Sequence, residues 1–119
     1  MINRIAVIIR YKEPFVIWIN TSDPYDDDPG ITAESANEDN NVYLIDDRYA
    51  ENFEAWLKRN FKTLFDNELY GWYTDPSLWP EKRDLRTFRK WFAVEYFTVV
   101  LDLGRGGIFD DDYFDENES

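Results

Sequence analysis

The chain has 119 residues, a formal net charge of −12, and neither histidine nor cysteine. That length suits one domain, and a composition of 44% hydrophobic and 18% aromatic residues predicts a packed core. The missing residue types exclude thiolate chemistry, thiolate zinc sites and histidine-based catalysis, so any catalysis would depend on carboxylates, Lys, Arg, Tyr or an oxygen-bound metal.

Two runs of β-branched and aromatic residues open the chain, at residues 3–10 and 14–20. Both runs are apolar on both faces, which is typical of strands that are covered on each side. Residues 11–13 separate the runs and Pro14 opens the second one, so the sequence predicts a hairpin or a close strand pair. Turn signals (Asp-Pro, Pro-Gly and an Asn cluster) then predict a long connection over residues 21–41.

A third strand is predicted over residues 41–46, and the clearest helix over residues 48–69. Asp47 is expected to cap this helix, and Gly71 is expected to end it. The apolar residues of the helix form one stripe at helical spacing: Tyr49, Phe53, Trp56, Leu57, Phe61, Leu64, Phe65 and Leu69.

The remainder of the chain predicts a second, shorter helix and a last strand. A turn-rich connector comes first, in which Asp75 is expected to cap one short helical turn. Asp84 is expected to cap the helix over residues 84–93. Residues 94–103 alternate as a strand does, and the Gly-rich residues 104–107 end it.

The predicted order of elements is therefore β-β-β-α-α-β. It favours an α+β fold, with a mostly antiparallel sheet of about four strands and two helices packed on one face. Residues 1–107 are expected to form a single globular domain that includes a long acidic loop at residues 21–41. Residues 108–119 are expected to form an acidic C-terminal tail.

No segment of the sequence has the length of a membrane span, which needs about twenty apolar residues. The apolar run nearest the N-terminus, residues 5–9, lies between two arginines and is too short for a secretory signal. We therefore expect a cytoplasmic protein that does not associate with a membrane, and the lack of cysteine fits that expectation.

The negative charge is concentrated in two segments. Residues 21–47 carry nine acids and no base, and residues 110–119 carry six acids and no base. Since those segments account for −15, the rest of the chain has a net charge of +3. This distribution argues against duplex nucleic acid as the main ligand, because phosphate binding needs a net basic surface.

Acidic segments of this kind keep a protein soluble, and they can also bind a basic protein surface. The aromatic residues within the acidic tail suit docking into an apolar groove that bases flank. The residues predicted to bind such a partner are Asp26, Asp27, Asp28, Phe109, Asp110, Asp111, Asp112, Tyr113 and Phe114. A calcium loop of the EF-hand type is not supported, since Asp28 stands where that loop requires glycine.

The second predicted helix carries a basic face formed by Lys82, Arg86, Arg89 and Lys90. This face is typical of a solvated amphipathic helix. It could also hold the acidic tail or loop of the same chain, and a phosphate or RNA contact, which the flanking acids would oppose, is the third alternative.

These observations leave three hypotheses for the function. The first is an acidic protein-interaction or inhibitory module that binds a basic partner. The second is a small carboxylate- or Mg-dependent enzyme or ligand-binding domain, and the third is an oligomeric structural subunit such as a homodimer. The sequence singles out no catalytic residue, no metal ligand and no cofactor, so an enzyme is the less favoured class.

Overall fold

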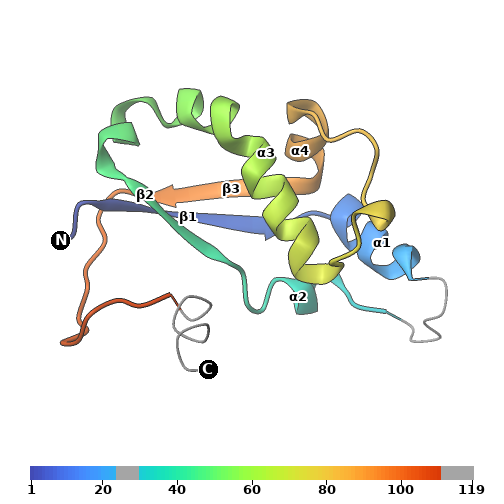
Figure 1. Cartoon of the computed structure of the whole chain (residues 1–119), viewed down its shortest axis with the longest axis horizontal. Helices are drawn as coiled ribbons and strands as arrows, with labels where there is room; N and C mark the ends of the chain where they lie inside the picture. Colours follow the sequence, from blue (N-terminus) through green and yellow to red (C-terminus); the bar gives the residue numbers. More distant parts are fainter. Residues whose placement is uncertain (24–29, 111–119) are drawn as a thin grey trace.

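The structure is a computed structural model that describes residues 1–23 and 30–110. The strand β1 (Arg4–Tyr11) lies at its centre. β2 (Val42–Asp46) and β3 (Phe92–Phe97) each pair antiparallel with β1, which gives the strand order β2-β1-β3 (Figure 1). The fold is therefore of the α+β class with an antiparallel sheet, as predicted. The described residues form three strands, and not about four.

The strand predicted over residues 14–20 is wrong, because this segment lies in the helix α1 (Glu13–Ser22). Its buried residues are spaced as on one helical face: Phe15, Val16, Trp18 and Ile19. Ile17 lies on the other side of the helix and is 52% exposed. Pro14 stands in the first turn, where its missing N–H breaks no hydrogen bond and its fixed φ suits the helix. The proline therefore marks the start of a helix.

The long predicted helix exists, but it begins and ends later in the chain than expected. Asp47 starts a 3-10 turn, η1 (Asp47–Asn52), and the helix α3 (Phe53–Trp72) follows it. Asn52 caps the helix in place of Asp47, since its side chain accepts a backbone N–H of the first turn at 3.4 Å. Gly71 lies inside the last turn and does not end the helix. No helix in the described part of the chain, α3 included, is long and apolar enough to cross a membrane.

The two other predicted caps are confirmed. The Asp75 carboxylate accepts the Ser77 N–H at 3.0 Å and so begins the short turn η2 (Pro76–Leu78). The Asp84 carboxylate accepts the Thr87 N–H at 2.8 Å at the start of α4 (Leu85–Trp91). These hydrogen bonds favour the charged form, and they lower the pKa of both carboxyl groups.

β3 ends at Phe97, although the sequence predicts a strand as far as residue 103. The neighbouring strand explains most of the difference, because Phe97 pairs with Ala6 and β1 begins only two residues earlier, at Arg4. The Ile2 N–H still donates to the Val100 carbonyl at 2.8 Å. Residues 101–103 then have no described strand beside them, so their strand-like sequence stays unpaired.

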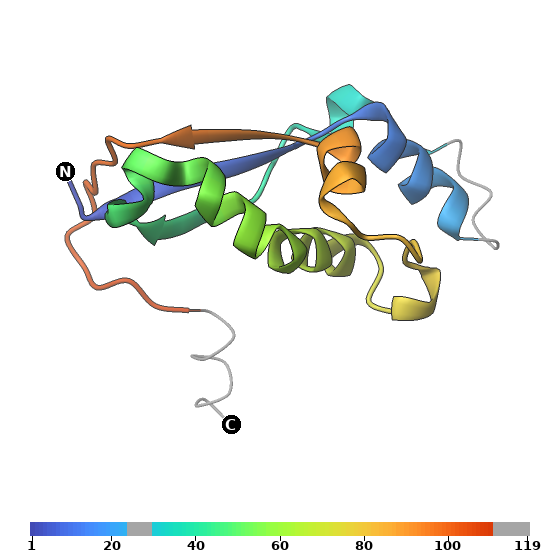
Figure 2. The ribbon, with the colours of Figure 1, turned by 90° about the horizontal axis from the view of Figure 1, so that it is seen from above.

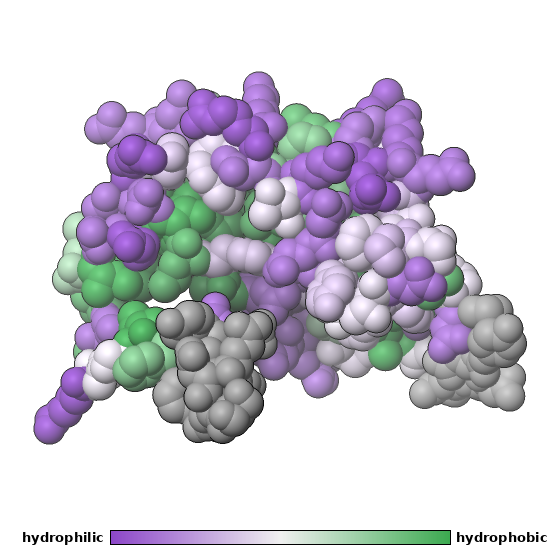
Figure 3. All heavy atoms as spheres, in the orientation of Figure 1, coloured by the Kyte–Doolittle hydropathy of each residue, from purple (hydrophilic) through white to green (hydrophobic). Residues whose placement is uncertain are grey.

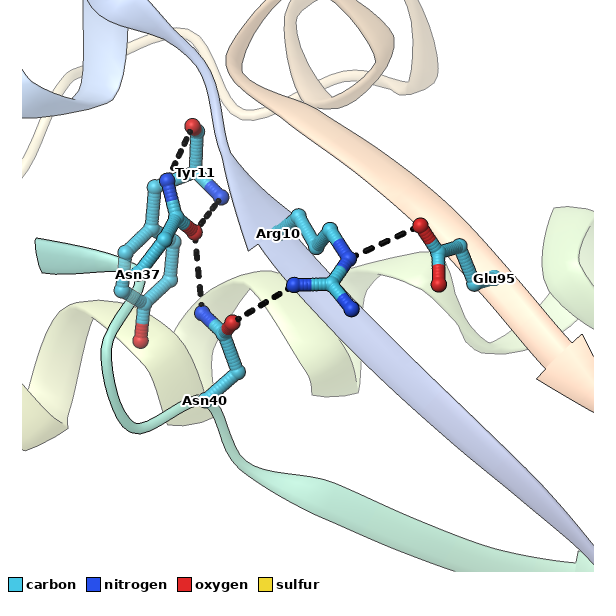
Figure 4. Close-up of polar contacts among 5 residues, drawn as sticks. All are labelled: Arg10, Tyr11, Asn37, Asn40 and Glu95. Carbon is cyan, nitrogen blue, oxygen red and sulfur yellow. Dashed lines mark hydrogen bonds and ion pairs between the residues drawn. The ribbon is translucent and has the colours of Figure 1, made fainter. Parts of the chain in front are cut away.

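The opposite end of β1 lacks a strand neighbour on the β2 side, because β2 pairs only as far as Ile8. Asn37, which follows the short helix α2 (Ala33–Ala36), takes that place with its side-chain amide (Figure 4). Its oxygen accepts the Tyr11 N–H at 2.8 Å, and its nitrogen donates to the Tyr11 carbonyl at 3.0 Å. One asparagine thus satisfies the last backbone groups of the central strand.

The core lies on one face of the sheet. Ile5, Val7 and Ile9 of β1 are fully buried there, and α3 and α4 lie on that same side of the sheet (Figure 2). A cluster of aromatic rings fills the space between β1, α1 and the two helices. Its fully or almost fully buried members are Phe15, Phe65, Phe88 and Phe92.

Replacement of Phe15 tests how far the fold depends on this cluster. The Phe15 ring is fully buried and lies 4.6 Å from the Tyr11 ring and 4.8 Å from the Phe92 ring, between centroids. Phe15→Ala should lower the free energy of unfolding by about 3–5 kcal/mol, as measured in urea. Tyr70→Ala, at a ring that is 58% exposed, is the control and should change it by less than about 1 kcal/mol.

Candidate functional site

Most of the residues predicted to bind a partner lie outside the described residues: Asp26, Asp27, Asp28, Asp111, Asp112, Tyr113 and Phe114. Phe109 and Asp110 are described and exposed, Phe109 to 73%. The partner site expected from the sequence therefore stays a prediction. The described chain offers three other features: a buried carboxylate, a groove at one edge of the sheet, and an uncovered sheet face.

Glu68 of α3 is fully buried, and its carboxylate accepts hydrogen bonds from three side chains. The Tyr11 hydroxyl donates at 2.6 Å, the Asn41 amide donates at 3.0 Å, and the Tyr43 hydroxyl donates as well. Tyr43 in turn accepts from the Asn67 amide at 2.8 Å. A buried carboxylate without such donors would cost much free energy, so this network is what allows Glu68 inside the fold.

The two tyrosine hydroxyls hold their protons more tightly than a tyrosine in water. Burial raises the pKa of Tyr11 and of Tyr43, and the hydrogen bond to the Glu68 carboxylate raises each of them further. Because the three groups join β1, β2 and α3, the network fixes how α3 crosses the sheet. Its position in the core indicates a structural role.

The cavities in the described part of the chain lack the paired carboxylates that the enzyme hypothesis needs. Four cavities of about 160 to 520 Å³ are lined by described residues, and each has at most one acidic residue in its lining: Glu54, Asp66 or Asp23. No group of three or more potential metal-binding side chains occurs within residues 1–23 and 30–110. These cavities therefore hold no converging pair of carboxylates of the kind that general acid–base catalysis uses.

A groove of about 300 Å³ lies beside β3 and next to α3 and α4. Phe53 and Leu57 of α3 and Phe92 and Val94 of β3 supply its apolar lining. Tyr96 also lines it, with its ring stacked on Phe53 at 4.1 Å between centroids. β3 has β1 on one side, and no strand of the described chain lies on its other side. The groove thus adjoins a strand edge that can pair with another strand.

Basic side chains surround this groove. Lys12 lines it, and the Lys12 ammonium donates to the Arg89 carbonyl at 2.9 Å. The Arg89 guanidinium also lines it and forms an ion pair with Glu54. Three more exposed bases stand within one helical turn of the lining residues: Lys58, Arg86 and Lys90. No described acid forms an ion pair with these three, so they add positive charge near a groove whose one acidic lining residue, Glu54, is paired with Arg89.

The sheet face opposite α3 and α4 is apolar. Leu44, Ala6 and Phe97 lie side by side across the three strands, and Val42 and Ile8 form part of the next row. Val42 is 57% exposed, Leu44 48% and Phe97 49%. Exposed apolar residues gathered on one sheet face favour contact with another molecule.

Two ion pairs border the same sheet face. Arg4 lies 3.5 Å from Asp46 at one end, and the Arg10 guanidinium donates to the Glu95 carboxylate at 2.8 Å at the other end (Figure 4). Each of these side chains is 40–53% exposed, so the pairs add little to stability. Their effect is to leave this face without net charge.

A C-terminal arm, which we define as residues 98–110, leaves the sheet at the end of β3. It carries large apolar residues that are mostly exposed: Val99 at 65%, Leu101 at 66%, Leu103 at 90% and Ile108 at 76%. Figure 3 shows hydrophobic residues gathered at the end of the molecule where the N-terminus lies and the arm departs. The arm thus presents to solvent the kind of side chain that a core or an interface normally buries.

No protein-family model, curated protein or solved structure matches this chain. Its function is therefore argued from the geometry of these surfaces.

The sequence revealed part of the groove and missed the rest. The basic face of the second helix includes Arg89, which lines the groove, and its neighbours Arg86 and Lys90. Its apolar lining comes from segments far apart in the chain, since only the fold brings Phe53 beside Val94. No sequence signal marks these residues as neighbours.

Because the pKa values of Tyr11 and Tyr43 are raised in the folded chain, the free energy of unfolding should decrease at alkaline pH. In the unfolded chain both hydroxyls lose their protons near pH 10, whereas in the folded chain they keep them to higher pH. Their contribution is therefore complete below about pH 10 and is lost as the pH rises further. The free energy of unfolding, measured in urea from pH 8 to 11.5, should fall in the alkaline range.

Tyr11→Phe and Tyr43→Phe should each reduce that alkaline loss, because each removes one of the shifted hydroxyls. Tyr70→Phe removes an exposed hydroxyl outside the network and serves as the matched control. If the free energy of unfolding fell equally with alkaline pH in all three variants, the hydrogen-bond network around Glu68 would not be the cause of that fall.

Proposed function

We propose that this chain is a protein-interaction module that binds an extended polypeptide segment at the free edge of β3. The observation that carries the proposal is the groove beside that edge, with its apolar lining and basic border. An added strand gains affinity from backbone hydrogen bonds to the edge strand, and it gains specificity from the pockets that its alternate side chains enter.

The alternation of β3 decides which side chains of the bound segment would face the groove. Phe92, Val94 and Tyr96 line the groove, whereas Phe97 belongs to the opposite face. Every second residue of an added strand therefore faces the groove. An apolar residue there suits the lining, and an acidic residue suits Lys12 and Arg89. The preferred ligand is thus an extended segment that combines apolar and acidic residues.

The acidic loop and tail support a second part of the same proposal. Asp26, Asp27, Asp28 and the acids from Asp110 onward would attract a basic partner surface over long range, as in an inhibitory module. We also propose a cytoplasmic location, which the lack of cysteine supports.

Charge reversal at the groove tests the proposal. The probe is a fluorescein-labelled peptide of alternating valine and threonine with aspartates at its C-terminal end, and binding is followed by fluorescence anisotropy. Lys12→Glu should weaken this binding by about tenfold, because an acid then faces the acidic end of the peptide. Protection of β3 amides from hydrogen exchange in the complex should show that the peptide lies along this edge.

Arg59→Glu is the matched control, since it makes the same charge change at an exposed residue of α3 outside the groove. It should bind the peptide about as well as the unchanged protein. A peptide with lysines in place of the aspartates should bind the unchanged protein more weakly. Equal losses for the two variants, or protection confined to β2, would overturn the proposal.

A further inference from the structure

We infer that the segment bound at the β3 edge is the C-terminal arm of a second copy of this chain, so that two copies exchange arms across a two-fold axis. The inference rests on the proposed function and adds the identity of the partner. In this arrangement residues 98–103 of each copy continue β3 as a strand along the β3 of the other copy.

The composition of the arm fits such a strand. Val99, Leu101 and Leu103 alternate with the period of a strand, and all three are at least 65% exposed within one copy. Within one copy the Ile2 N–H reaches the Val100 carbonyl, but no described strand lies beside residues 101–103, and the outer edge of residues 98–103 has no described strand beside it. The β3 edge of a second copy supplies the missing backbone partner.

The direction of pairing brings opposite charges together. A two-fold axis perpendicular to the sheet makes the two strands antiparallel, so each arm runs from the partner's Phe97 toward the partner's Phe92. α4 ends directly before Phe92, and its exposed bases are Arg86, Arg89 and Lys90. The last residue of the arm and the sequence after it are acidic, with six acids and no base from residue 110 to residue 119. One chain therefore carries both the acidic segment and the basic surface that would receive it.

One register of pairing between the two arms places suitable neighbours on both faces of the paired strands. Placing Thr98 opposite the partner's Thr98 puts Phe97 opposite the partner's Val99, and Val94 opposite the partner's Asp102. Residues directly opposite each other share a face of the sheet. The apolar pair then extends the uncovered apolar face, and the Asp102 carboxylate lies at the basic groove that Val94 lines.

The area that a stable dimer needs explains why the arm takes part. A stable interface buries about 800 Å² on each partner. The edge of a six-residue strand such as β3 supplies too little surface on its own, whereas an arm paired along β3 adds the exposed apolar residues at 99, 101 and 103 to the uncovered sheet face.

A single engineered cysteine tests the register, because the chain has no cysteine of its own. Thr98 is exposed, so Thr98→Cys should leave the fold intact. Under mild oxidation this variant should form a covalent dimer, as seen on a non-reducing gel. Leu44→Cys, at an exposed residue of the opposite edge strand, should stay monomeric at the same protein concentration.

Sedimentation equilibrium tests the partner itself with the full chain. Leu101→Asp with Leu103→Asp should raise the dissociation constant of the dimer by about 100-fold, since two apolar contacts in each copy become charged. Arg86→Glu with Lys90→Glu should also weaken the dimer. Arg48→Glu with Arg59→Glu, an equal charge change away from the groove, should not.

Mixing the two defective double variants gives the decisive result. The variant with Arg86→Glu and Lys90→Glu (the α4 variant) keeps an intact arm, and the variant with Leu101→Asp and Leu103→Asp (the arm variant) keeps an intact groove. The mixture should therefore contain a heterodimer that neither variant forms alone. A chain that is monomeric at every concentration, or a mixture without the heterodimer, would overturn the second copy as partner. In that event, binding of a synthetic arm peptide (residues 98–110) to the arm variant would leave the proposed function standing, and no binding would refute both.

Discussion

The extent of β1 is the constraint on which the rest of the structure depends. It is the one described strand with neighbours on both sides, so every other part of the sheet begins or ends where β1 allows. At its last residue, Tyr11, no β2 residue is available and the Asn37 side chain takes over the backbone hydrogen bonds. At its first residue, Arg4, the opposite occurs. The chain after Phe97 continues with strand-like residues, but beyond the hydrogen bond between Ile2 and Val100 no described strand lies beside it. An apolar arm without a strand neighbour at residues 101–103 is the direct result.

Glu68 shows how a small aromatic core tolerates a charge-bearing group. The surrounding core is built from phenylalanine and tryptophan rings, which pack closely but offer few hydrogen bonds. The carboxylate is therefore satisfied by a hydroxyl from β1, a hydroxyl from β2 and the amide of Asn41, which directly precedes β2. Since the two hydroxyls belong to strands, the same hydrogen bonds fix the crossing of the helix over the sheet. With α3 fixed in this way, Phe53 and Leu57 come to lie beside the β3 edge.

The sequence identifies most elements, and its errors have physical causes. The caps at Asp75 and Asp84 could be predicted because a cap depends on residues that are neighbours in sequence. The sequence predicts a strand over residues 14–20 where the structure has a helix, because a short apolar segment buried in an aromatic core fits both periods and a proline can begin either element. The end of β3 could not be predicted, since it depends on where β1 begins. For the same reason the groove was hidden, because its lining is a property of the assembled layers.

The separation of charge within the chain bears on what kind of partner it has. A chain that only needed solubility could spread its acids evenly, but here the acids are concentrated at residues 21–47 and 110–119 while bases gather around the groove. The bases at Lys58, Arg86 and Lys90 form no ion pair with a described acid, so they can bind an acidic ligand. An acidic segment follows the apolar arm in the same chain, and antiparallel pairing of two β3 edges leads that segment to these bases. The apolar sheet face is neutral and bordered by internal ion pairs, so it adds no repulsion between like-charged copies. A second copy of the chain therefore already has the apolar strand and the acidic segment that this edge would bind, whereas a different ligand would need to have both.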